Sequence, residues 1–258
     1  MTHKTNKTFR VSDRLSNCLW LWMFVHAAIA SPNLVAAQGI DTNRPGFSFS
    51  PGIVPLGRWQ LETGVSYTRF DSNTRTTSLP TAELRFGVAD QVEVFLSSLS
   101  WSRTESRGGD ASGLVDAALG AKVNFSSAEA KTKMALLFQL SAPVGDNSYT
   151  SDSWDPGLAF IWSHEGHVPI AGTVKLTKFD SGYQLDCGLK LPFSLGEARS
   201  AFVEWEANLP EGAGSAHWLN GGYQWLLEKR MQIDVNAGLG LNDRAGDFRL
   251  GVGFSIGL

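Results

Sequence analysis

Residues 248–258 read FRLGVGFSIGL and alternate between apolar residues and small or polar ones. Every second position from Phe248 to Leu258 is a large apolar residue, and Arg249, Ser255 and three glycines lie between them. Successive side chains of a β-strand point to opposite faces of the sheet, so this segment has one wholly apolar face. Residues 231–240, MQIDVNAGLG, alternate in the same way. The C-terminal end of the chain therefore predicts two amphipathic strands.

The same alternation repeats from Gly57 onward, in segments that each end in a turn. Short connections such as HEGH and LEKR alternate with longer polar ones such as SRTESRGGDAS, which is typical of bacterial barrels with short periplasmic turns and long outer loops. The sequence predicts an all-β fold: a closed antiparallel transmembrane β-barrel of about 12 strands, an even number as such barrels require, with both ends in the periplasm. The strands are expected near residues 59–67, 82–86, 92–96, 115–125, 134–140, 158–162, 170–176, 183–191, 201–209, 219–227, 231–239 and 248–258.

A soluble β-sandwich would also alternate, with its apolar side chains turned inward. Three features favour lipid contact instead. The segments have similar lengths, the polar face mixes Gly, Ser and Asn with charges of both signs, and aromatic residues such as Trp59, Trp162 and Trp225 lie near segment ends. Aromatic girdles and a polar interior are typical of outer-membrane barrels.

The first 37 residues are expected to be a signal peptide. Four basic residues precede an apolar run, residues 18–30, that is too short to span a bilayer. Small residues at Val35–Ala37 predict cleavage after Ala37, with Ala30 as a second candidate; the alternative is an uncleaved anchor. We therefore divide the chain into a signal peptide (1–37), an irregular N-terminal lead-in (38–56) and the barrel (57–258). The predicted location is the outer membrane of a Gram-negative cell, and the predicted partners are outer-membrane lipid and the barrel-assembly machinery.

Charge and cysteine content exclude two further possibilities. The chain carries a net charge of −3, and the predicted signal peptide removes four basic residues but only one acidic residue. An acidic chain lacks the basic face that nucleic acid requires. Cys18 would leave with the signal peptide, so Cys187 would stand alone and no internal disulfide is expected.

Several stretches resemble the family of outer-membrane proteins known as the MetA-pathway of phenol degradation. They include NRPGFSFSPGIVPLGRWQLETG (43–64), ELRFGVADQVEV (83–94), LVDAALGAKVNF (114–125) and GLGLNDRAGDFRLGVGFSIG (238–257), with shorter matches at 141–145 and 202–210. The chain departs from the pattern at Leu258, where such barrels usually end in Phe. The resemblance implies a barrel and a role in moving hydrophobic or aromatic compounds, and it implies no catalytic residues.

The predicted mature chain contains three histidines. His164 and His167 flank a turn with Glu165, but zinc sites need three or four ligands, so a solvated turn is favoured. His217 lies near the outer end of a segment, where a lipid-hydrolysing barrel could place a Ser–His pair. No adjacent segment shows a serine and an orienting acid to complete it. The sequence thus predicts no catalytic residue, no metal and no cofactor.

Charged residues on the polar face form the candidate site. They either pair across strands and fill the lumen, or line a narrow path. The predicted function is a porin-like channel or transporter for small hydrophobic or aromatic compounds; a lipid-acting enzyme and a non-conducting structural barrel are the alternatives. We expect a constricted lumen, with residues 43–57 folding into the barrel mouth. The candidate lumen-lining residues are Glu62, Glu83, Arg85, Glu93, Asp116, Lys122, Lys133, Asp186, Lys190, Glu204, Glu206, Asp234 and Arg249.

Overall fold

A computed structural model describes residues 40–258, so the predictions for residues 1–37 lie outside the described range. Within that range, no helix is long and apolar enough to cross a membrane. Every named element is a strand. The strands are β1 (Trp59–Arg69), β2 (Arg75–Ala89), β3 (Val92–Glu105), β4 (Ala111–Leu114), β5 (Ala117–Asn124), β6 (Thr132–Ala142), β7 (Asp155–His164), β8 (Ile170–Phe179), β9 (Gly182–Ser194), β10 (Arg199–Pro210), β11 (Ala216–Glu228), β12 (Met231–Gly240) and β13 (Phe248–Gly257).

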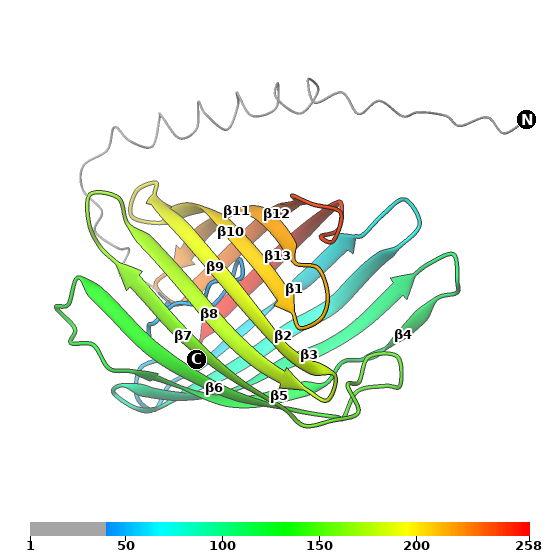
Figure 1. Cartoon of the computed structure of the whole chain (residues 1–258). Helices are drawn as coiled ribbons and strands as arrows, with labels where there is room; N and C mark the ends of the chain where they lie inside the picture. The colour runs from blue at the N-terminus through cyan, green and yellow to red at the C-terminus, as the bar shows by residue number, and fades with distance from the viewer. Residues whose placement is uncertain (1–39) are drawn as a thin grey trace, which may run out of the picture. The chain divides into compact units, whose positions relative to one another are not determined.

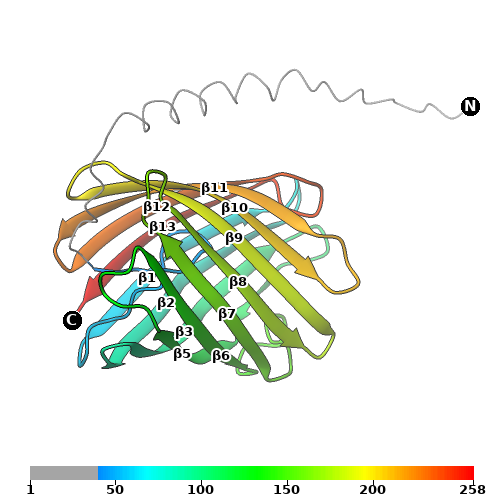
Figure 2. The ribbon, with the colours of Figure 1, turned by 60° about the vertical axis from the view of Figure 1, so that its left-hand side comes forward.

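The strands form one closed antiparallel sheet, whose tilted strands wrap around a common interior (Figures 1 and 2). The first and last strands pair without interruption from Gln60↔Gly257 to Arg69↔Phe248. β4 and β5 both pair with β3 and together fill one position, so the barrel has 12 strands plus one short extra strand. Closure matters because lipid offers no hydrogen bonds to an open sheet edge. The predicted fold and strand number are confirmed.

The apolar face of the sheet points outward. Val235, Leu239 and Val252 are 49%, 61% and 59% exposed, whereas Asp234 and Ser255 on the opposite face are 2% and 0% exposed. A soluble sandwich would show the reverse pattern. The exposed apolar band fits the hydrocarbon of a membrane, and the polar residues lie inside.

Several strands extend beyond their predicted ranges, and two of them extend furthest. β2 and β3 run past their expected ends into segments that we expected to be loops. Polar cross-strand contacts hold these extensions together: the hydroxyls of Thr76 and Thr104 lie 2.8 Å apart, and those of Ser78 and Ser102 lie 2.7 Å apart. Such pairs stabilise a sheet without an apolar face, so the alternation that marks a lipid-facing strand is missing there.

The wall is irregular where β2 meets β3. The pairing register shifts between Ser78 and Thr81 and again between Ala82 and Leu84. Pro80 lies within this stretch and has no N–H for the ladder. Ser98, opposite, has a φ of 60°. This irregular wall borders one of the cavities described below.

Candidate functional site: a plugged lumen

The lead-in lies inside the barrel. We call residues 40–57 the plug; apart from one isolated bridge, Leu56↔Gly87, it forms no strand. It enters at the barrel end that carries the C-terminus and the short turns, since Ile40 N–H donates to the Lys229 carbonyl in a turn. We expect this end to face the periplasm and name it so. A side chain at Gly87 would collide with the Val54 and Pro55 carbonyl oxygens, so the plug's close approach to β2 requires glycine.

Three lumen carboxylates accept hydrogen bonds from main-chain N–H groups of the plug. Glu62 accepts from residues 43 and 44, at 3.1 and 3.0 Å. Glu204 accepts from residues 47 and 48, at 2.8 and 2.7 Å, and Glu93 accepts from residue 54 at 2.8 Å. Hydrogen bonds to ionised acceptors are stronger than neutral ones. The plug is thus fixed to β1, β3 and β10 through its backbone.

Three lumen cations donate to carbonyl oxygens of the same segment. Arg85 reaches the carbonyl of residue 41 at 2.8 Å, Lys122 that of residue 50 at 3.0 Å, and Lys190 that of residue 48 at 2.8 Å. A buried backbone carbonyl needs a partner. The cations supply partners where the plug has no secondary structure.

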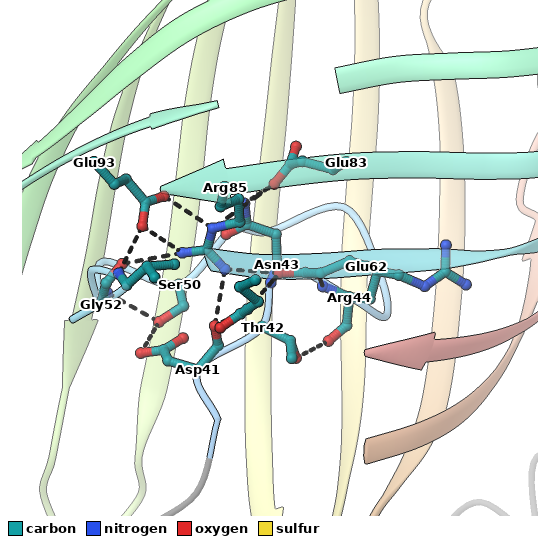
Figure 3. A network of polar contacts seen from close by, with 12 residues as sticks. Asp41, Thr42, Asn43, Arg44, Ser50, Gly52, Glu62, Glu83, Arg85 and Glu93 are labelled. Atoms are coloured by element: carbon teal, nitrogen blue, oxygen red, sulfur yellow. Dashed lines mark hydrogen bonds and ion pairs between the residues drawn. The ribbon is translucent and has the colours of Figure 1, made fainter. Parts of the chain in front are cut away.

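The same charges also pair with one another (Figure 3). Arg85 lies between Glu62 and Glu93, at 2.7 and 2.9 Å, and Lys122 is 3.1 Å from Glu93. Arg85, Glu93 and Lys122 are fully buried. Glu83 accepts a hydrogen bond from the plug's Asn43 at 2.6 Å and lies 3.9 Å from Arg85. Buried charges are tolerable only when they are paired in this way.

The remaining predicted residues divide into two groups. Glu206 pairs with Arg249, Asp234 with the plug's Arg44 at 3.4 Å, Lys190 with Glu204 at 3.8 Å, and Asp186 accepts from Asn208 at 2.9 Å. Two residues lie apart from these contacts. The Asp116 carboxylate accepts from the amides of residues 145 and 151 in the loop before β7, and Lys133 is 3.8 Å from Glu165 in a periplasmic turn.

The plug separates two cavities. On the periplasmic side lies a cavity of about 720 Å³, lined by Asp90, Gln91 and other residues of the turns. On the opposite side lies a cavity of about 430 Å³ between the plug and β2, β3, β6 and β8. Arg44 and Phe49 of the plug line both. A third space of about 290 Å³ lies between the plug and β1, β2, β12 and β13.

A family model described as "Putative MetA-pathway of phenol degradation" matches residues 42–258. The chain belongs to this family. The match covers every strand and all but the first two residues of the plug, so the resemblance that the sequence motifs predicted is confirmed. A search of curated proteins returned no match.

Solved structures similar to this family member are outer-membrane barrels. The COG4313 outer membrane channel from Pseudomonas putida F1 has a TM-score of 0.66 at 16% identity, covering 83% of this chain and 99% of that one. The translocator domain of autotransporter NalP from Neisseria meningitidis has a TM-score of 0.53 at 10% identity, covering 97% and 99%. The NanC porin has a TM-score of 0.52 at 8% identity, covering 76% and 98%. At these identities the likeness establishes the fold.

His217 has a serine beside it that was not singled out from the sequence: Ser215, two residues earlier, places Oγ 2.9 Å from His217 Nε2. Asn242 holds the segment through the His217 N–H and the Ser215 carbonyl. Among residues 40–258, no carboxylate is hydrogen-bonded to the His217 ring. The pair therefore lacks the acid that orients the histidine of a triad.

Of the other two histidines within residues 40–258, His164 ends β7 and His167 lies in the turn that follows. His164 Nδ1 is 2.8 Å from the Thr132 hydroxyl. In the part of the chain that the structure describes, no three His, Cys, Asp or Glu side chains converge as a metal site.

Sequence reasoning missed several lumen residues of this family member. Lys175, Gln139 and Asp155 were not singled out, although Lys175 alternates with the exposed Val174 and Leu176. The alternation of inward-facing and outward-facing positions along each strand was the signal in the sequence that could have placed them in the lumen. The plug's own contribution had no such signal, because an irregular segment has no periodicity to reveal which groups face the wall.

Proposed function

We propose that this protein is an outer-membrane channel for small hydrophobic or aromatic compounds, rather than an enzyme. The observation that carries the proposal is the plug. It occupies the lumen and contacts the charged side chains that would otherwise line a water-filled path. Spaces of about 290 to 720 Å³ remain beside it. Ligand sites of roughly 300–1,000 Å³ accommodate compact molecules.

The side chains around these spaces support apolar cargo. Phe47 lines the 290 Å³ space, Phe49 lines both larger cavities, and Phe95 lines the cavity of about 430 Å³. Aromatic rings offer large apolar contact surfaces. A sugar or hydrated ion would instead meet many hydrogen-bonding groups that already have protein partners, such as Glu62 and Arg85.

Uptake into proteoliposomes that contain lipopolysaccharide tests the proposal. We expect radiolabelled phenol to enter faster than in protein-free liposomes, and arabinose to enter at the protein-free rate. Equal entry of phenol with and without protein would support a non-conducting structural barrel. Faster arabinose entry would indicate a general porin.

We also propose that residues 1–37 direct export and are removed, and that the barrel-assembly machinery inserts the mature chain. The basic segment, the short apolar run and the small residues at 35–37 support this proposal. Mass spectrometry of membrane-extracted protein should find a chain that begins near Gln38. An intact Met1-containing chain held in the inner membrane would contradict this.

A further inference from the structure

The cavity of about 430 Å³ between the plug and β2, β3, β6 and β8, here called the outer cavity, has two unlike sides. One side is apolar: Phe95 and Leu137 belong to a buried cluster against which the plug's Phe49 packs. The other side is polar and includes Lys175 and Gln139. A cavity with this division fits a ligand that has a flat apolar body and a polar head.

Lys175 is the lumen cation without a protein partner. Within residues 40–258 its ammonium makes no hydrogen bond and no ion pair, whereas Lys122 and Lys190 make both. Asp186 stands opposite Lys175 in the β8–β9 register, but its carboxylate accepts from Gln184 and Asn208 instead. A half-buried ammonium that has no direct hydrogen bond or ion pair favours an anionic ligand.

A second polar group at the outer cavity also lacks a partner. The Ser100 hydroxyl is buried and has no hydrogen-bond partner in the described part of the chain. It belongs to β3, beside the irregular β2–β3 wall, and lines the cavity. Buried hydroxyls are normally hydrogen-bonded, so this one indicates an acceptor or donor supplied by a bound molecule.

The acidic groups near the cavity make their hydrogen bonds and ion pairs with other residues, although Asp186 and Glu83 still attract the Lys175 charge. Glu83 accepts a hydrogen bond from Asn43. Glu62 is paired with Arg85. A carboxylate bound at the β8 side of the cavity would supply the direct partner that Lys175 lacks within residues 40–258.

We propose that the outer cavity binds a small aromatic monocarboxylate, with its carboxylate at Lys175 and Gln139 and its ring on Phe49. The charge requirement comes from Lys175, and the ring requirement comes from Phe49 and Phe95. The inference rests on the proposed channel function and names a class of solute for it. A singly charged carboxylate matches the single unpaired ammonium.

Calorimetric titration of the detergent-purified full barrel tests this. The probes are benzoate and benzamide, which share a ring and differ in charge at the head. Benzoate should bind one-to-one and at least tenfold more tightly than benzamide. Lys175→Gln should weaken benzoate binding at least tenfold, and Lys175→Arg should retain it. The matched control, Lys178→Gln, changes an exposed lysine on the same strand and should bind benzoate like the unaltered protein.

The inference is overturned if benzoate does not bind, if benzoate and benzamide bind equally, or if Lys175→Gln binds benzoate normally. Heat-dependent migration on gels confirms that each variant is a folded barrel. Phenol uptake separates the two proposals: uptake without benzoate binding removes this inference alone, whereas absence of uptake removes the proposed channel.

Discussion

Glu204 is the strongest single anchor of the plug, and its removal should open the barrel. Its two carboxylate oxygens accept the main-chain N–H groups of Phe47 and Ser48, at 2.8 and 2.7 Å, and its side chain is fully buried. Glu204→Ala leaves both N–H groups without an acceptor and Lys190 without its carboxylate. The change therefore acts on the plug and the lumen wall together.

The size of the effect follows from the two lost hydrogen bonds. A hydrogen bond to a charged group contributes about 1.5–3 kcal/mol, so two at the lower limit contribute about 3 kcal/mol. Since about 1.4 kcal/mol corresponds to a tenfold change, the equilibrium between seated and displaced plug should shift about a hundredfold. Displacement exposes the full lumen to ions.

Planar-bilayer recording measures this shift directly. The Glu204→Ala barrel should open to a large conductance about a hundred times more often than the unaltered barrel. Glu228→Ala, which removes an exposed carboxylate at the end of β11, is the matched control and should leave opening unchanged. If a barrel without residues 40–57 conducts strongly but Glu204→Ala stays closed, the backbone contacts do not hold the plug and the reasoning is wrong.

Three further perturbations test the architecture. Val235→Arg places a charge on the lipid face and should lower the free energy of unfolding, measured in urea, by about 2–4 kcal/mol. Asn236→Arg, on the lumen side, should lower it much less, and equal losses would contradict the assignment of faces. Arg85→Ala leaves the buried Glu62 without its cation and Glu93 with Lys122 alone, and it should destabilise the barrel by about 3–5 kcal/mol in the same assay; an unchanged midpoint would show that the cluster is not desolvated. Deleting residues 43–57 should raise ion conductance in planar bilayers, and an unaltered protein that already conducts strongly and stably would refute the narrow lumen.

The fold could be predicted because lipid imposes a simple rule on each strand. Every lipid-facing position must be apolar, as at Val235 and Val252, so alternation was visible along the chain. The rule fails beyond the apolar band. Thr76 and Thr104 pair through hydroxyls on strands that continue past it, and we expected loops there.

The candidate site could be predicted only in part. The alternation along each strand was enough to identify lumen charges such as Arg85 and Glu204. It did not reveal that their main partner is the backbone of residues 40–57, because an irregular segment shows no period. Contacts between nearby residues, such as Ser215 with His217, depend on local backbone geometry that residue types do not specify.

The way the barrel holds its plug has a consequence for the evolution of this sequence. Glu62, Glu93 and Glu204 recognise main-chain amides, which every residue except proline possesses. These bonds do not depend on the plug's side chains, although Asn43 and Arg44 add side-chain contacts to Glu83 and Asp234. Substitutions at positions such as Phe47 and Phe49 therefore leave the main-chain bonds available. A lineage could thus alter its choice of cargo by drift in one short stretch, with the membrane-embedded scaffold left intact.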